Sequence, residues 1–315
     1  MYSSDIIFVV FLMSPICIGF VGNSLLFMLY MYTFFTQSHL KKPIDLIFIH
    51  LTLVNVFTIL FRLIPDVMSS FGVRHFLDDV GCKATLYTYR VTRGLSICTT
   101  SLLSAFQAIT ISPSTSKWTW LKSKMSTCMF PSFLFFWIVN MLIYIHIIKT
   151  VEAKNNVTIT GSGYSQLYCQ AKQLEQQYSI ALFSVMMIRD LLFVVLMMSS
   201  SIYMVNLLYK HSRRAQHVHS FSLPSQPSPE IKATHNILSL VSCFVFFYCS
   251  NDFFTLYLFY RPEKNPSLER ITGIISACYP TICPFVLMKN NKIISKFISS
   301  ISKMRIIFSP RTFSR

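Results

Sequence analysis

Seven long apolar segments dominate this chain of 315 residues and constrain its fold more than any other feature. In lipid, only helices and closed barrels satisfy their own backbone hydrogen bonds, and an apolar helix of about 20 residues crosses the hydrocarbon core. Charged residues make up 13% of the chain, against about 25% in a typical soluble domain. We therefore predict an all-α membrane protein, a single seven-transmembrane helix bundle over residues 1–315. The predicted spans are residues 6–36, 44–65, 83–111, 127–148, 178–209, 233–260 and 271–288.

Basic residues divide unevenly between the segments that connect these spans. The first, third and fifth connections, together with the tail at 289–315, hold sixteen Lys and Arg, whereas the opposite set holds eight, along with eight Asp and Glu. Because Lys and Arg accumulate in cytoplasmic loops, we expect an extracellular N-terminus and a short cytoplasmic C-terminal tail. The net charge of +16 is thus explained by membrane orientation, and no nucleic acid partner is predicted.

Two cysteines, Cys82 and Cys169, fall in the margins of segments placed outside the cell, whereas the other seven lie within apolar spans. The outside of the cell is oxidising, so we predict a disulfide between these two. The sequon that begins at Asn156 lies in the same exterior set, which makes Asn156 a predicted glycosylation site. The charge, cysteine and sequon patterns therefore agree on one orientation.

Ionisable side chains inside the spans are the main candidates for function. An arginine near the bilayer centre costs about 2.5–3.5 kcal/mol on insertion scales, so such residues usually face the bundle interior. At about 1.5 Å of rise per residue from the outer ends of their spans, Arg90, Arg93 and Asp252 fall at similar depths in the outer half. Arg189 and Asp190 lie near the middle of the fifth span. Because they are adjacent, we expect them to face different helices, and they need not pair with each other.

Two interpretations of these charges stay open. They hold the bundle together by pairing between helices, or at least one of them lines a ligand cavity open to the outside. Aromatic neighbours would line the apolar part of such a cavity. Three basic residues against two acidic ones favour, weakly, an anionic or acceptor-bearing ligand. The candidate ligand-binding residues are Arg90, Arg93, Arg189, Asp252, Tyr87 and Tyr257.

No feature of the sequence favours catalysis, a cofactor or a metal. The eight glycines are scattered and form no phosphate-binding loop, and no nucleophile–base arrangement stands out. His217 and His219 lie in a basic loop without a cysteine or acidic cluster, so a solvated loop is preferred over a metal site. A membrane transporter is the alternative of a different class, but the odd number of spans and the lack of an internal repeat disfavour it.

Four motifs stand in order along the spans and the loop after the fifth span. They are Gln107-Ala108-Ile109-Thr110-Ile111-Ser112-Pro113, Arg189-Asp190, His217-Val218-His219 and Tyr279-Pro280-Thr281-Ile282-Cys283-Pro284-Phe285-Val286-Leu287. In these motifs the chain resembles vomeronasal type-1 receptors, over about residues 1–297. The resemblance implies a multi-pass plasma-membrane receptor for a small-molecule pheromone or odorant. A type-2 bitter-taste receptor shares much of this architecture and is the nearer alternative.

The resemblance also implies coupling to a heterotrimeric G protein of the inhibitory class. Rhodopsin-like receptors generally carry an acidic-Arg-aromatic triplet at the inner end of the third span, where this chain has Phe106-Gln107-Ala108. We expect the sixth and seventh spans to move, because Pro280 and Pro284 predict a kink in the seventh. The residues predicted to edge the cleft for the G protein are Gln107, Lys210, Arg213 and Arg214.

Overall fold

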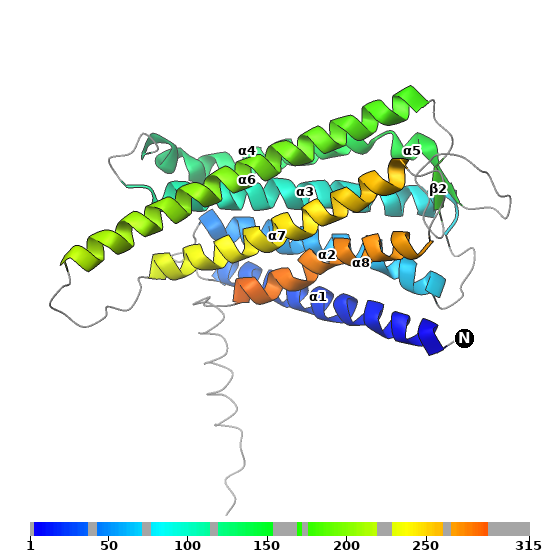
Figure 1. Cartoon of the computed structure of the whole chain (residues 1–315), viewed down its shortest axis with the longest axis horizontal. Coiled ribbons are helices and arrows are strands. Elements are labelled where there is room, and N and C mark those ends of the chain that lie inside the picture. Colours follow the sequence, from blue (N-terminus) through cyan, green and yellow to red (C-terminus); the bar gives the residue numbers. More distant parts are fainter. Residues whose placement is uncertain are drawn as a thin grey trace, which may run out of the picture.

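The structure is a computed structural model, and it describes residues 3–36, 43–70, 77–113, 119–153, 169–171, 176–218, 229–260 and 266–288. Seven of the helices in these ranges are long and apolar enough to cross a membrane, which confirms the predicted fold. They run along the long axis of the molecule (Figure 1). The predicted tail at 289–315 and Asn156 lie outside the described residues. The helices are α1 (Ser3–Thr36), α2 (Pro43–Ser70), α3 (Asp79–Ile111), α4 (Thr119–Tyr144), α5 (Ile147–Thr150), α6 (Gln176–Val218), α7 (Pro229–Tyr260) and α8 (Pro266–Met288).

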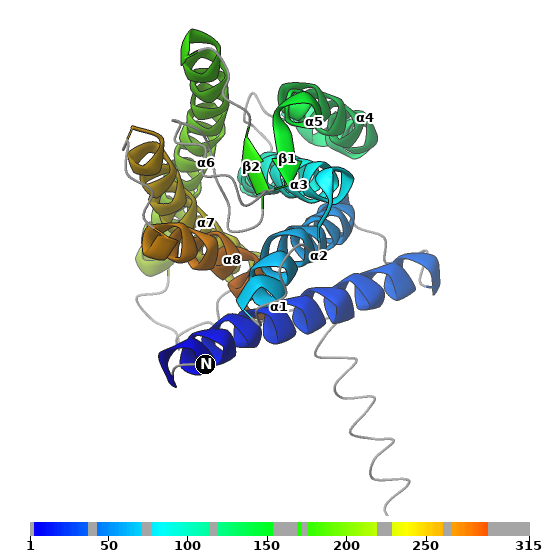
Figure 2. The ribbon, with the colours of Figure 1, turned by 90° about the vertical axis from the view of Figure 1, so that its right-hand side faces the viewer.

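A two-stranded antiparallel sheet lies at one end of the bundle, which we call the hairpin end (Figures 1 and 2). Its strands are β1 (Val151–Ala153) and β2 (Cys169–Ala171). A disulfide joins Cys169 on β2 to Cys82 in the first turns of α3, the pairing predicted from the sequence. The backbone amide of Ala153 also donates a hydrogen bond of 2.7 Å to the carboxylate of Asp79. The start of α3 is therefore fixed to the sheet by one covalent and one polar contact.

The fourth span predicted at 127–148 lies within the membrane-crossing segment Thr127–Thr150, and the helix is interrupted inside it. Helix α4 ends at Tyr144, and the short helix α5 begins at Ile147. At the break, Nδ1 of the His146 imidazole lies 3.0 Å from the carbonyl oxygen of Ile143. The last carbonyls of a helix have no partner within it, so this side chain satisfies one of them and lets the helix end.

Helix α6 is longer than its predicted span. It continues past the predicted end at 209 to Val218 and contains 43 residues, which at 1.5 Å each gives a length of about 64 Å. This is roughly twice the thickness of the hydrocarbon core. Figure 1 shows its C-terminal part extending beyond the neighbouring helices at the end opposite the hairpin. The basic end of α6 therefore lies outside the apolar part of the bundle.

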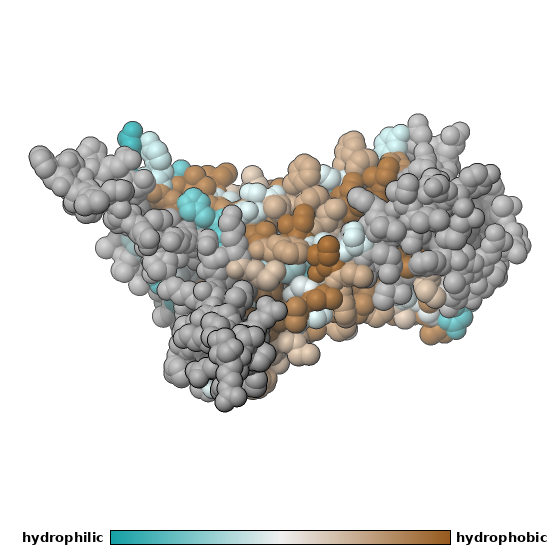
Figure 3. Space-filling model, turned by 90° about the horizontal axis from the view of Figure 1, so that it is seen from below, coloured by the Kyte–Doolittle hydropathy of each residue, from teal (hydrophilic) through white to brown (hydrophobic). Residues whose placement is uncertain are grey.

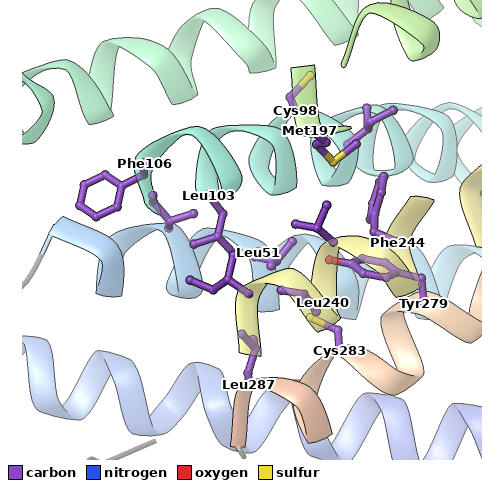
Figure 4. Close-up of a cluster of buried hydrophobic side chains, with 14 of the residues drawn as sticks. Leu51, Cys98, Leu103, Phe106, Met197, Leu240, Phe244, Tyr279, Cys283 and Leu287 are labelled. Atoms are coloured by element: carbon purple, nitrogen blue, oxygen red, sulfur yellow. The ribbon is translucent and has the colours of Figure 1, made fainter. Parts of the chain in front are cut away.

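Helix α3 occupies the centre of the bundle and contacts α2, α4, α6, α7 and β1. Around it, side chains from several helices point toward one another and form a buried apolar core (Figure 4). Leu51, Leu103, Met197, Leu240 and Cys283 are all fully buried in this core. Each comes from a different helix, so the core joins α2, α3, α6, α7 and α8.

The outward faces of the helices are apolar as well. Leu134 on α4 and Leu192 on α6 are among many large apolar side chains that the protein itself leaves exposed. Figure 3 shows such side chains gathered over the middle of one face, with hydrophilic residues toward the two ends. A helical bundle that exposes apolar side chains around its middle is suited to contact with lipid tails.

The carboxamide of Asn23 on α1 compensates for a proline in α8. Pro284 has no amide hydrogen, so the carbonyl of Pro280, four residues earlier, loses its normal helical partner. Nδ2 of Asn23 donates to that carbonyl at 2.8 Å. The amide of Asn55 on α2 donates to Oδ1 of Asn23 at 3.3 Å, and the hydroxyl of Ser96 on α3 donates to Asn55 at 3.4 Å. This chain of neutral hydrogen bonds joins α1, α2, α3 and α8.

We predict that Asn23→Ala lowers the free energy of unfolding of the receptor by about 1–2 kcal/mol, because it leaves the buried Pro280 carbonyl without its donor from α1. The same substitution should cost less in a Pro284→Ala background, where residue 284 regains an amide hydrogen. Thermal unfolding of the four proteins in detergent measures this difference. Thr33→Ala is the control, because the Thr33 hydroxyl donates to a carbonyl of its own helix. If Asn23→Ala cost the same free energy of unfolding with Pro284 as with Pro284→Ala, the explanation would be contradicted.

Candidate functional site

The central helix α3 carries a row of buried polar side chains along most of its length. They are Thr92, Arg93, Ser96, Thr99, Thr100, Ser101, Ser104 and Gln107. Because α3 is surrounded by other helices, these groups face protein and not lipid, which is where polar side chains in a membrane protein are tolerated. The only ionised residue in this row is Arg93, so its partners determine the electrostatics of the bundle centre.

The guanidinium of Arg93 lies between carboxylates from two other helices. Its Nη2 is paired with Oδ1 of Asp252 on α7, and its Nη1 lies 3.7 Å from Oδ2 of Asp190 on α6. The ring of Tyr248, one turn before Asp252 on α7, lies beneath the guanidinium at 4.4 Å. The Tyr248 hydroxyl donates to the backbone carbonyl of Arg93 at 2.5 Å. Arg93 therefore links α3 to α7 through its charge, an aromatic ring and its backbone.

The second arginine of the site connects α6 to α4. Nη1 of Arg189 donates to Oδ1 of Asn140 at 2.9 Å, and Nη2 donates to the hydroxyl of Tyr144 at 2.8 Å. Nε and Nη2 also donate to Oδ1 of Asp190, at 2.9 and 2.6 Å. The two residues contact different helices as expected, Arg189 on α4 and Asp190 beside Arg93 on α3, and they also pair with each other. The arginine side chain is long enough to reach the adjacent carboxylate and still bond to α4.

Together these residues form what we call the charge cluster, made of Arg93, Arg189, Asp190 and Asp252. Two cations and two anions leave it without net charge, and its contacts run in sequence from α4 through α6 and α3 to α7. Burying an ionised group is costly unless it is paired and hydrogen-bonded, and each member here has an opposite charge beside it. The cluster is therefore compatible with the interior of a membrane bundle.

Gly94, next to Arg93, leaves room for the cluster to reach α4. A Cβ atom at this position would overlap Oδ1 of Asn140 and lie 2.9 Å from Nη1 of Arg189. The hydrogen bond between Asn140 and Arg189 passes directly against the backbone of α3 at this point. A glycine is therefore required here for close approach and not for an unusual backbone angle.

Of the six predicted ligand-binding residues, the structure brings three together in the charge cluster, namely Arg93, Arg189 and Asp252. The expectation that Arg93 and Asp252 lie at the same depth is confirmed by their contact. Tyr87 lies apart, since its hydroxyl donates to the carbonyl of Met141 on α4 at 3.1 Å. The guanidinium of Arg90 lies 5.9 Å from the ring of Tyr89. Tyr257 is 41% exposed near the end of α7.

Four members of the site were not predicted from the sequence: Asn140, Tyr144, Tyr248 and Gly94. Tyr248 carried a usable signal, because it precedes Asp252 by four residues and so shares its helix face. Asn140 is polar within an apolar span, which also marks it as facing the bundle. The role of Gly94 depends on the contact between α3 and α4, and no pattern in the sequence indicates that contact.

Residues predicted to face the G protein lie toward the end opposite the hairpin. Lys210 and Arg213 are exposed on α6. The side chain of Arg214 lies outside the described residues. Gln107 is only 4% exposed, and its Nε2 donates to the hydroxyl of Thr234 on α7 at 3.1 Å. In this conformation Gln107 joins α3 to α7 inside the bundle.

No group of three or more His, Cys, Asp and Glu side chains within the described ranges is arranged to hold a metal ion. His50, a possible ligand by residue type, is instead enclosed by neutral partners. Its Nδ1 lies 2.9 Å from the Thr99 hydroxyl, and its Nε2 accepts a hydrogen bond of 3.0 Å from the indole of Trp137. These contacts join α2, α3 and α4, so His50 has a structural role.

We predict that Gly94→Ala lowers the stability of the receptor by about 1–3 kcal/mol, because the added methyl group displaces Asn140 and Arg189. Thermal unfolding in detergent measures the loss. The exposed Ala84 on the same helix offers a control in Ala84→Ser, which should have little effect. In an Asn140→Ala background the overlap with Asn140 is gone, so Gly94→Ala should cost less. An undiminished cost would contradict the proposed contact.

Comparison with known proteins identifies the family. Residues 6–300 match the family described as "Vomeronasal organ pheromone receptor family". Vomeronasal type-1 receptor 3 of Homo sapiens is 36% identical over 92% of this chain and 93% of its own length. Vomeronasal type-1 receptor 4 of Homo sapiens is 35% identical, over 91% of this chain and 95% of the relative. Olfactory receptor class A-like protein 1 of Danio rerio is 30% identical, over 87% of this chain and 86% of the relative. The chain belongs to the vomeronasal type-1 receptor family, and it is a chemosensory G-protein-coupled receptor of the plasma membrane, not an enzyme.

Proposed function

We propose that this receptor binds a small, mostly apolar pheromone or odorant in the outer half of the bundle and activates an inhibitory-class G protein. The observation that carries the proposal is the charge cluster, which joins four helices through ionised side chains inside the membrane. Intramembrane charges that face the bundle interior usually mark a functional site. A bundle that needed only stability would be served as well by apolar packing, since buried ion pairs contribute little net stability.

The proposed orientation places the hairpin end outside the cell. The distribution of Lys and Arg between the loops supports it, and so does the disulfide between Cys82 and Cys169, because disulfides persist on the oxidising side of the membrane. In this orientation Arg93 and Asp252 lie in the outer half of the bundle, and the basic end of α6 is cytoplasmic. Asn156 would then be available for glycosylation.

The proposed transmission of the signal runs through α7. This helix is joined to α3 by Arg93 with Asp252, by the Tyr248 hydroxyl, and by Gln107 with Thr234 near the other end. A ligand shifts a receptor only by binding one arrangement better than another. A ligand at the charge cluster that favours a displaced α7 would therefore also separate Gln107 from Thr234.

Separation of α7 from α3 would expose Gln107 toward the end of the bundle from which the basic end of α6 extends. Lys210 and Arg213 already lie exposed there, and Arg214 follows in the sequence. We propose that these four residues edge the cleft that receives the G protein. Gln107 contributes in the active state only, because in the present conformation it is buried against Thr234.

The test of the proposed function is ligand-evoked G-protein activation in cells that display the receptor, with a panel of steroids and volatiles. We expect a dose-dependent response that pertussis toxin abolishes, since that toxin inactivates inhibitory-class G proteins. Arg93→Ala should abolish the response at unchanged surface display, whereas the lipid-facing Phe253→Leu should not. Loss of display in Arg93→Ala would favour a purely structural role for this arginine. Ligand-dependent flux without G-protein activation would refute the receptor function.

The contact between Gln107 and Thr234 gives a second prediction. Thr234→Val removes the hydroxyl that accepts from Gln107 with little change in shape, whereas Thr234→Ser keeps it. A hydrogen bond contributes about 1 kcal/mol, so its loss should raise basal G-protein activity about five-fold when the inactive state predominates. Basal activity at matched surface display measures this. Unchanged activity in Thr234→Val would show that the contact does not oppose opening.

A further inference from the structure

Arg93 has two carboxylates within reach, and they belong to different helices. It is paired with Asp252 on α7, whereas Oδ2 of Asp190 on α6 lies 3.7 Å from Nη1, just beyond hydrogen-bond range. The other oxygen of Asp190, Oδ1, holds Arg189 in place. A movement of less than about 1 Å would therefore bring Arg93 into full contact with Asp190, given a usual charge-assisted distance of about 2.8 Å.

The two carboxylates differ in accessibility. The side chain of Asp252 is 18% exposed, against 3% for Asp190 and 7% for Arg93. Of these three, Asp252 is therefore the group that a ligand reaches first. Asp190 is held from behind by Arg189, which is itself bonded to Asn140 and Tyr144 on α4. Asp190 is thus the fixed member of the pair of acids, and Asp252 is the accessible one.

The arrangement responds differently to ligands of opposite polarity. A ligand that donates a hydrogen bond to Asp252 releases Arg93, which then pairs with Asp190. A ligand carboxylate that pairs with Arg93 draws it away from Asp252. Asp190 is negatively charged as well, so it cannot take the place of the arginine beside Asp252. With a donor that is itself a cation, every charged group keeps an opposite charge in contact, because Arg93 and Arg189 use different oxygens of Asp190. With a carboxylate ligand, Asp252 has no cation in contact, which is costly inside the bundle, so the donor ligand is favoured.

We propose that Asp252 is the docking group for a protonated amine on the ligand, and that Asp190 becomes the counterion of Arg93 when the ligand occupies Asp252. A protonated amine replaces the charge of Arg93 at Asp252, which a hydroxyl group does not. This inference rests on the proposed receptor function and specifies the ligand class for the same site. It replaces the weak preference for an anionic ligand that the count of basic and acidic residues suggested.

The exchange would also change how α7 is held. With Arg93 turned toward Asp190, α7 loses its ionic contact with α3, and the neutral hydrogen bond from the Tyr248 hydroxyl to the backbone carbonyl of Arg93 remains. Helix α6 gains the contact that α7 loses. The ligand thereby shifts the attachment of α3 from α7 to α6, and α7 becomes free to move.

A test that needs no ligand uses substitutions of the two acids. Asp252→Asn removes the charge as a bound amine would neutralise it, so basal G-protein activity should rise about five-fold at matched surface display. Asp190→Asn on its own leaves Arg93 paired with Asp252 but removes the carboxylate that holds Arg189, so its surface display serves as a reference for the double variant. In the double variant, which combines Asp190→Asn with Asp252→Asn, Arg93 has no carboxylate partner in the charge cluster. Its surface display should therefore fall well below that of Asp252→Asn alone. Phe253→Leu is the matched control on α7. Unchanged activity in Asp252→Asn, or equal display of the double variant, would overturn the exchange.

The ligand class is tested with primary amines, alcohols and carboxylates on hexyl, cyclohexylmethyl and phenylethyl skeletons. We expect activation of the unsubstituted receptor by at least one amine, with the matched alcohol at least ten-fold weaker and the carboxylate inactive. Asp252→Asn should remove the preference for the amine. A stronger response to a carboxylate, or none to any amine, would overturn the assignment of the amine. If every variant is displayed and none activates any G protein, the proposed receptor function fails, which is distinguishable from failure of the exchange alone.

Discussion

The structure depends on the need to neutralise an arginine inside a membrane. Arg93 lies in the central helix, where lipid offers no solvation, and it is tolerated because α6 and α7 each bring an aspartate to it. Arg189 then compensates the aspartate of α6 and attaches that helix to α4. The neighbours of α3 on this side are thus determined by charge pairing. Apolar packing alone would allow the same helices to slide or rotate past one another.

The seven spans and the depth of their charges could be predicted from the sequence, because hydropathy and helix rise report these directly. The similar depth predicted for Arg93 and Asp252 is consistent with their contact, although the sequence left open whether they pair. The pairing of Arg189 with Asp190 was missed because side-chain reach, and not helix-face geometry, decides it. The predicted fifth span, 178–209, agrees with the membrane-crossing segment Gln177–Lys210, but hydropathy does not show that helix α6 continues in water to Val218. Gly94 could not be recognised without knowing that Asn140 lies against it.

Two polar systems share α3 and divide the bundle between them. On one side, the neutral hydrogen bonds of Asn23, Asn55 and Ser96 join α1, α2 and α8 to it. On the other side, the charge cluster joins α4, α6 and α7. The Asn23 amide already donates both to the Pro280 carbonyl and to the Gly19 carbonyl of its own helix, at 2.8 and 2.7 Å, so neither contact is an unused alternative. Arg93, by contrast, has an alternative partner in Asp190, whose Oδ2 lies 3.7 Å from its Nη1. The side of the bundle formed by α1, α2 and α8 is therefore held in one arrangement, whereas the side formed by α4, α6 and α7 has two arrangements available.

This difference indicates which helix is free to respond to a ligand. Interactions that change in a switch need an alternative partner, because breaking a buried contact without one is too costly to occur often. In the charge cluster, Arg93 has that alternative, and the contact it would give up is the one to α7. Next to it, Tyr248 stacks on Phe244, with 4.4 Å between ring centres. Phe244 meets Tyr279 of α8 edge to face at 4.5 Å (Figure 4). Tyr279 in turn shares a hydrogen bond of 3.0 Å with Thr100 of α3. A displacement of α7 at Asp252 must therefore repack this aromatic layer, which makes an all-or-none shift more favourable than a gradual one.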